Sequence, residues 1–197
     1  MSTQIETTFK VQLDNRDRKT VFFRAILVAP VFFFASSFTV DNWDNRNTSS
    51  YGLLILPVVL ALVFRGVYPS WVLTFNKSLF ALVNRICAYF LLLTDDYPSI
   101  EESEAVSITY PEIDGGRTLN RWLPLIKWAM AIPLFIVGLA YTLYAFVLLV
   151  LGWFSILLNA SLPDYCADGI VRTAQYWNRI YGYAILLVTD EYPTFSL

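Results

Sequence analysis

The run WAMAIPLFIVGLAYTLYAFVLLVLGWFSILLNASLP, residues 128 to 163, decides the fold class of this chain. It contains 36 residues and no ionisable side chain other than tyrosine. A helix needs roughly 20 apolar residues to cross the hydrocarbon core of a membrane, and about 17 is the lower limit. The run therefore predicts two short membrane helices, at about 122–140 and 142–160, with a tight turn near Gly138–Tyr144. A hairpin that enters one leaflet and returns is the alternative, because each arm is close to the minimum length.

A similar hairpin is predicted nearer the N-terminus, with helices at about 21–40 and 51–67. Of the 14 lysines and arginines in the chain, only Arg46 lies in the two predicted hairpin tips, 41–47 and 138–144. Lysine and arginine accumulate on the cytoplasmic side of membrane proteins. Both termini and the central segment are therefore predicted to be cytoplasmic.

The composition supports a membrane protein and argues against several functions. The chain is 56% hydrophobic and only 15% charged, whereas soluble domains carry about 25% charged residues. A net charge of −2 argues against a nucleic-acid partner. The absence of histidine removes the commonest general base and transition-metal ligand. Cys87 and Cys166 are isolated. We therefore expect no enzyme activity, no cofactor and no metal site.

The two halves of the chain, 1–100 and 101–197, resemble each other. The best matches pair Arg24-AILVA-Pro30 with Lys127-WAMAI-Pro133, Asn84-Arg85-Ile86 with Asn178-Arg179-Ile180, and LLLTDDYPSI (91–100) with LLVTDEYPTF (186–195). Self-similarity at a long period indicates a structural repeat. With two spans in each copy, the chain returns to its starting side, so both copies enter the membrane from the same side. The two repeats are therefore predicted to be parallel and related by an axis normal to the bilayer. The predicted fold class is an all-α membrane protein with two parallel repeats.

Two further elements are predicted in each repeat. Phe9–Leu13 and Val106–Tyr110 alternate in polarity like short β-strands, and we expect them to pair with the extended segments 97–100 and 192–195. Polar residues at helical spacing predict amphipathic helices at about 71–93 and 164–188. These helices lie in the membrane interface in one interpretation. In the other interpretation, each helix is the third membrane span of its repeat, and its polar stripe is buried between helices.

The amphipathic helices carry four candidate contacts for lipid phosphate or a partner protein: Lys77, Arg85, Arg172 and Arg179. A guanidinium matches the geometry of phosphate oxygens. The alternative is that these cations snorkel to the interface or cap backbone groups. Asp168 and Arg172 are also spaced to form an i, i+4 ion pair.

Each half ends in an acidic motif that is followed by tyrosine and proline. Asp95-Asp96 precedes Tyr97-Pro98, and Asp190-Glu191 precedes Tyr192-Pro193. Adjacent carboxylates can form an interaction motif for a hard cation or share a proton. One acidic pair supplies too few ligands for a dedicated metal site, however. The alternative is structural: the proline ends the helix, and the tyrosine lies at the interface.

Several segments together resemble the bacterial membrane family described as domain of unknown function 4389. In the second half they are SITYPE (107–112), LNRWLPLIKWAMAIPLFIV (119–137), WFSILLNASLP (153–163) and TDEYPTFSL (189–197). The first half is similar mainly in FRGVYP (64–69) and LLLTDDYPSI. The family favours histidine or a similar residue after the proline at Pro133, where this chain has Leu134. The resemblance implies a helical protein of the bacterial inner (cytoplasmic) membrane with no assigned activity.

The sequence therefore predicts a non-catalytic integral membrane scaffold or an accessory subunit of a membrane protein complex. Its expected partners are membrane lipids and either another membrane protein or a second copy of this chain. A channel or transporter for an apolar or lipid substrate is the alternative. An ion path is not expected, because such paths use intramembrane ionisable residues and the predicted apolar runs hold none.

Overall fold

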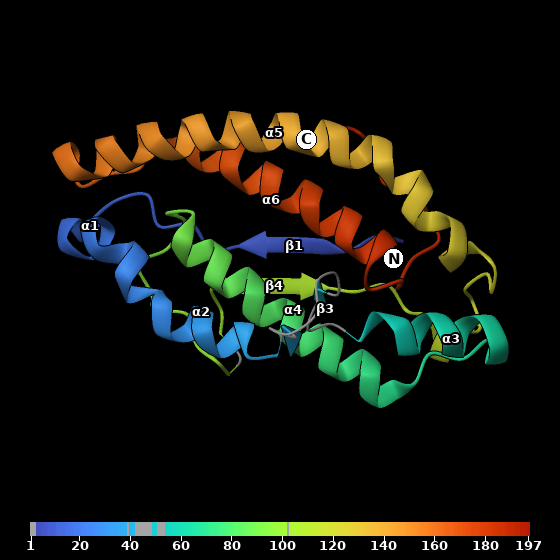
Figure 1. The fold of residues 1–197 in the computed structure, drawn as a ribbon. Helices are drawn as coiled ribbons and strands as arrows, with labels where there is room; N and C mark the ends of the chain where they lie inside the picture. The colour runs from blue at the N-terminus through green and yellow to red at the C-terminus, as the bar shows by residue number, and fades with distance from the viewer. Residues whose placement is uncertain (1–2, 39, 42–48, 51–53, 102) are drawn as a thin grey trace.

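The computed structural model describes residues 3–38, 40–41, 49–50, 54–101 and 103–197, and the chain is mostly helical (Figure 1). In chain order the elements are β1 (Glu6–Phe9), α1 (Arg18–Leu27), α2 (Ala29–Ser36), β2 (Val40–Asp41), β3 (Ser49–Ser50), α3 (Ile55–Arg65), α4 (Ser70–Phe90), β4 (Val106–Thr109), the 3-10 turn η1 (Asp114–Gly116), α5 (Leu123–Asn159) and α6 (Asp164–Ala184).

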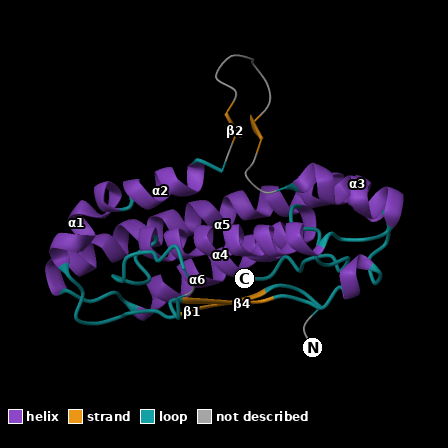
Figure 2. Ribbon diagram, turned by 90° about the horizontal axis from the view of Figure 1, so that it is seen from below, coloured by secondary structure: helices purple, strands orange, loops and turns teal. Residues whose placement is uncertain are grey.

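The elements are arranged in three layers (Figure 2). Strands β1 and β4 form a small sheet on one side, with α4 packed on β4 and α6 packed on β1. The third layer consists of α1, α2, α3 and α5, with α2 packed on α4 and α5 packed on α6. We call these four helices the outer layer. Strands β2 and β3 extend from the outer layer on the side away from the β1–β4 sheet (Figure 2).

Helix α5 corrects the prediction of a second hairpin. The segments expected at 122–140 and 142–160 form one continuous helix of 37 residues, with a length of about 55 Å. The expected turn near Gly138–Tyr144 is absent because Gly138 is a packing position. A Cβ atom on Gly138 would lie 2.8 Å from the Trp177 ring, so glycine lets α5 and α6 approach each other closely. Pro133 also lies inside this helix.

The corresponding part of the first half is interrupted. The helix expected at about 21–40 is divided into α1 and α2 at Val28, and Pro30, which lacks an amide hydrogen, lies in the first turn of α2. The helix expected at about 51–67 is α3, which begins at Ile55. Most of the predicted tip at 41–47 lies outside the described residues.

The amphipathic segments form α4 and α6, which end before the predicted limits of 93 and 188. Shortly after each helix, a leucine adopts the left-handed region, with φ of 65° at Leu92 and 57° at Leu187. This conformation does not continue an α-helix. The chain therefore turns away before each acidic motif.

The strand prediction was correct in position for β4 but wrong for β1, which covers Glu6–Phe9 where 9–13 was expected, and it was wrong in its pairing. β1 and β4 pair with each other in antiparallel fashion, with Glu6 opposite Thr109 and Phe9 opposite Val106. The strands therefore join the two halves of the chain, whereas the sequence suggested pairing within each half. The packing of α6 on β1 and of α4 on β4 likewise joins the two halves.

Candidate functional site

The acidic motifs lie at two buried ionic centres. In the first, which we call the Asp95 centre, the carboxylate accepts two bonds from Arg16, at 3.0 Å from Nε and 2.7 Å from Nη2. Nη2 of Arg24 forms a second ion pair with the same carboxylate. The backbone N–H of Asp17 donates to it at 2.9 Å. Both guanidiniums are almost completely buried. One carboxylate therefore connects the N-terminal loop, α1 and the chain that leaves α4.

The second, the Asp190 centre, has a similar plan with fewer groups. Nζ of Lys127 lies 2.7 Å from Oδ1 of Asp190 and donates to the carbonyl of Thr189 at 2.6 Å. The backbone N–H of Asn120 donates to Oδ2 of Asp190 at 2.6 Å. The ion-paired cations Arg24 and Lys127 occupy the matched positions before Pro30 and Pro133. The two centres thus use sequence-matched cations and carboxylates.

Aromatic rings complete both centres in the same way. The Arg24 guanidinium lies 4.5 Å from the centre of the Tyr89 ring, and Lys127 Nζ lies 5.1 Å from that of Tyr183. The motif tyrosines then pack edge-on against these rings, Tyr97 on Tyr89 at 5.9 Å and Tyr192 on Tyr183 at 5.7 Å. A cation over an aromatic face is attracted by the ring quadrupole. Each acidic-tyrosine-proline motif therefore supplies the counterion of a buried cation and a second ring, which packs on the tyrosine that faces that cation.

The protonation of Asp95 fits this structural role. Burial alone would raise the pKa of its carboxyl group. The hydrogen bonds from Arg16 and from the Asp17 N–H, together with the charges of Arg16 and Arg24, outweigh burial and hold the pKa below its ordinary value. A carboxylate that is held ionised by two guanidiniums is a poor general base. Asp95 is therefore held as the counterion of the two arginines.

The second acid of each motif plays a different part. Asp96 and Glu191 are exposed, and the backbone N–H of each donates to the preceding threonine hydroxyl, at 3.1 Å in both cases. The two members of each acidic pair thus have separate environments. Among the described residues, no group of three or more His, Cys, Asp or Glu side chains could hold a metal ion.

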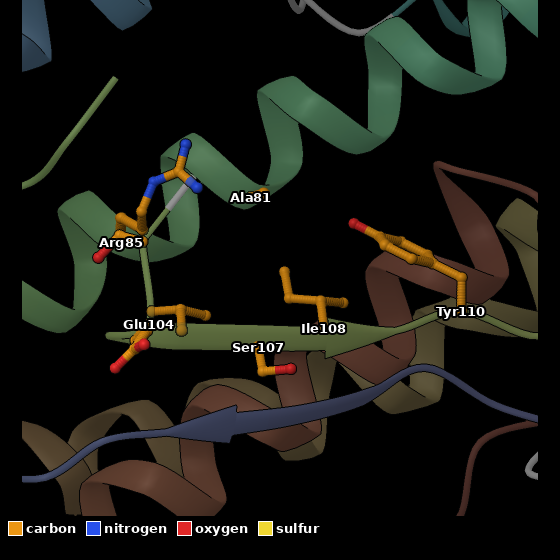
Figure 3. A pocket seen from close by; sticks show the side chains of 8 residues that line it. Ala81, Arg85, Glu104, Ser107, Ile108 and Tyr110 are labelled. Carbon is orange, nitrogen blue, oxygen red and sulfur yellow. The ribbon is translucent and has the colours of Figure 1, made fainter. Parts of the chain in front are cut away.

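The matched arginines Arg85 and Arg179 lie in two similar grooves. One groove, of about 620 Å³, lies between α4 and β4 and includes Ala81 and Arg85 (Figure 3). The other, of about 530 Å³, lies between α6 and β1 and includes Gln175 and Arg179. Arg85 donates to the carbonyl of Ile100 at 3.2 Å, and Arg179 donates to that of Ser196. Each arginine therefore binds the backbone that follows its own acidic motif.

Figure 3 shows that the Arg85 guanidinium points away from β4, whereas Ile108 and Tyr110 point toward α4. Lys77 lies over the Tyr110 ring, with Nζ 4.6 Å from the ring centre, and partial burial lowers the pKa of its ammonium group. Arg172 is exposed and forms the expected pair with Asp168, at 2.9 Å from Nε to Oδ2. The four candidate phosphate contacts are thus distributed over separate places and do not converge.

The burial of Arg24 and Lys127 was not predicted from the sequence. These cations directly precede the charge-free runs, which begin at residues 25 and 128, but Arg24 lies in α1 and Lys127 in α5, and both are buried. A usable signal was present in the sequence. A cation at the same place before each matched apolar segment requires a counterion, because an unpaired charge is costly in an apolar environment. The two matched aspartates were the available partners.

No family model, curated protein or solved structure matches this chain.

Proposed function

We propose that this protein is a non-catalytic membrane scaffold or accessory subunit whose outer layer lies in the lipid bilayer. The main support for this proposal comes from two helical stretches, Arg18–Ser36 and Leu123–Asn159. Both are long and apolar enough to cross a membrane, yet only 22% of the residues in the apolar window of each are buried by the rest of the protein. A core helix of a soluble protein would be mostly covered.

Exposed apolar side chains occur on all four helices of the outer layer. They include Phe22, Phe32 and Phe33 of α1 and α2, Leu56 and Phe64 of α3, and Ile136, Phe146 and Leu158 of α5. A large exposed apolar surface typically marks contact with a membrane or another protein. The opposite side carries the polar strand residues Glu6 and Thr8, which are exposed. This asymmetry supports a bilayer on one side and water on the other.

The geometry favours an orientation in which the long axis of the molecule follows the membrane plane. At about 55 Å, α5 is much longer than the hydrocarbon core of about 30 Å. Cations occur near both ends of the long axis, Arg18 and Lys19 at the start of α1 and Arg65 and Arg121 near the opposite end. An upright molecule would place cations on both membrane surfaces, against the positive-inside rule. A molecule that lies flat keeps all of these cations on one side of the membrane.

In this orientation the sheet and both termini face the cytoplasm of a bacterium, and α4 and α6 lie at the interface. The sequence-matched centres support an arrangement of two parallel repeats around an axis normal to the membrane, centred near the buried hydrogen bond between Asn178 and Asn84, 2.6 Å long. The resemblance to domain of unknown function 4389 stays a prediction and agrees with this proposal.

A scaffold is preferred to an ion channel because three of the buried cations already have carboxylate partners. Arg16 and Arg24 are bound to Asp95, and Lys127 is bound to Asp190. Buried charges in such pairs hold segments of chain together. A transporter for an apolar or lipid substrate is the alternative function, and flux in proteoliposomes above an empty-vesicle control would favour it.

Membrane association is tested by carbonate extraction and liposome flotation of the full chain. We expect the protein to remain in the membrane pellet and to float with vesicles. Leu139→Lys, on the exposed face of α5, should weaken flotation strongly, because a charge near mid-bilayer costs about 3 kcal/mol. Thr8→Lys, on the exposed face of β1, is the matched control and should float like the wild type. A protein that is freely soluble without detergent would refute the proposal.

Topology is tested by cysteine labelling in a Cys87→Ala, Cys166→Ala background. Lys10→Cys, next to β1, should react with a membrane-impermeant maleimide only from the cytoplasmic side. Ser49→Cys, in β3, should react only from the opposite side, because β2 and β3 extend from the outer layer away from the sheet. Labelling of both positions from the same side would contradict the proposed orientation.

The scaffold role is tested by purifying the tagged protein from its native membrane in a mild detergent. We expect a second membrane protein or a second copy of the chain to be recovered in a fixed ratio. Recovery of a lone monomer without lipid would count against the role, even if the membrane location holds.

A further inference from the structure

The outer layer contains a groove that is lined mainly by apolar side chains. It lies between α1 and α5, at the end of α4, and has a volume of about 470 Å³. This is within the range of about 300 to 1,000 Å³ that is typical of small-molecule sites. Its lining is almost entirely apolar and includes Phe22, Phe90, Leu149, Val150, Trp153 and Phe154.

Among the residues that line the groove, Arg24 has the ionisable side chain, and its charge is already neutralised by a carboxylate. Its guanidinium is paired with Asp95 and also donates to the carbonyl of Tyr89. The groove therefore offers a long ligand a surface of aromatic and aliphatic carbon. Such a surface gains free energy by covering apolar area and selects for a hydrocarbon chain.

The groove opens on the side of the molecule that the proposed function places in the membrane. Phe22 and Phe154, on opposite walls, are 59% and 54% exposed. Phe22 stacks on Trp153 with ring centres 6.4 Å apart, which connects the two walls through their aromatic rings. An acyl chain from the surrounding bilayer can therefore reach the groove from the side, without passing through water.

A cation lies where the two walls end. Arg18 precedes Phe22 by four residues and so lies on the same face of α1. It donates to the carbonyl of Leu158, four residues after Phe154, at 2.9 Å. Arg18 is exposed, and a guanidinium has five N–H donors, of which this bond uses one. The neighbouring Asp17 carboxylate accepts hydrogen bonds from the Lys19 N–H and the Thr20 hydroxyl, as the cap of α1.

We infer that the groove between α1 and α5 binds one acyl chain of an anionic phospholipid, whose phosphate group contacts Arg18. The inference rests on the proposed membrane location and adds to it a specific lipid class and a specific place. The apolar lining selects the chain, and the guanidinium selects the negative headgroup, since arginine and phosphate form paired, charge-assisted hydrogen bonds.

The test uses the full chain in a mild detergent with an equimolar mixture of phosphatidylglycerol and phosphatidylcholine, and counts bound lipids by native mass spectrometry. We expect one phosphatidylglycerol to be retained in preference to phosphatidylcholine by about tenfold, as a charged hydrogen bond can provide. Arg18→Gln should reduce this ratio to near one. Arg117→Gln removes an exposed arginine that follows η1 and does not line the groove, so it should leave the ratio unchanged.

A second variant tests the groove itself. Ala25 lines it from α1, so Ala25→Trp should fill it and reduce the retention of both lipids. Equal retention of the two lipids by the wild type, or a preference that survives Arg18→Gln, would overturn the inference. If the protein floats with vesicles yet shows no lipid preference, only this inference fails. If it does not float at all, the proposed function fails with it.

Discussion

The Asp95 and Asp190 centres perform the same task with different groups. Asp95 holds two guanidiniums, from Arg16 and Arg24, and its side chain is only 13% exposed. Asp190 holds one ammonium, from Lys127, and its side chain is 28% exposed. Both carboxylates also accept a backbone N–H from the loop before the outer-layer helix, from Asp17 and Asn120 respectively.

The difference shows how the two halves depend on charge. A guanidinium cannot lose its proton within a protein, so Arg16 and Arg24 require their counterion under all conditions. A lysine that loses its partner can become neutral. The first half also has the interrupted outer helix, in which α1 and α2 are short, whereas α5 is continuous. We therefore expect the Asp95 centre to contribute more to the stability of the fold than the Asp190 centre.

The largest effect is expected from Asp95→Ala. The change leaves two buried guanidiniums without their carboxylate, and breaking a buried pair in this way costs about 3 to 5 kcal/mol. The free energy of unfolding, measured by denaturant titration in a mild detergent, should fall by that amount. Asp96→Ala is the matched control, because Asp96 is exposed, and it should stay within about 0.5 kcal/mol of the wild type. Equal losses for the two variants would show that the buried ion pairs of Asp95 do not contribute specifically to stability.

A smaller loss is expected from Asp190→Ala. Lys127 keeps its bond to the Thr189 carbonyl and can release its proton, so the cost should be about 2 kcal/mol. The same titration measures it. In the Asp190→Ala background, Lys127→Met should recover part of the loss, since it removes the buried charge. A loss as large as that of Asp95→Ala would show that the lysine remains charged without its partner.

The mostly helical fold and the long apolar helices could be predicted from the sequence, because apolar runs and helical periodicity are local properties. The continuity of α5 could not. Gly138 resembles a turn residue in the sequence, and only the position of the Trp177 ring shows that it serves close packing. The pairing of β1 with β4 could not be predicted from local patterns either, because it joins segments about one hundred residues apart.

The ionic centres were partly predictable. The sequence singled out the acidic motifs, and it showed a cation at matched positions in the two halves. The pairing of Arg24 with Asp95 depends on how α1 packs against the end of α4, which no local pattern specifies. Arg16 was still harder to identify, because its matched position in the second half is occupied by Leu119.

The pH dependence of stability should distinguish the Asp95 centre further. The pKa of Asp95 lies below its ordinary value in the folded protein. The unfolded chain therefore binds a proton first as the pH falls, and stability is lost between the unfolded value of about 3.9 and the lower folded value. Unfolding titrations at pH 6, 4 and 3 should show this loss in the wild type and a shallower dependence in Asp95→Asn. Parallel curves for the two proteins would contradict the assignment.

The smallest effect is expected at the exposed pair of Asp168 and Arg172, which provides the reference for the buried centres. Both side chains are more than half exposed, so water and salt screen their attraction, and such pairs contribute about 0.3 to 0.5 kcal/mol. A double-mutant cycle with Asp168→Ala and Arg172→Ala should give a coupling energy of that size, reduced further in 0.5 M NaCl. The same cycle with Asp95→Ala and Arg16→Ala should give a coupling energy several times larger and almost independent of salt, because Arg16 is excluded from solvent. Similar coupling at both places would mean that burial does not set the strength of these pairs.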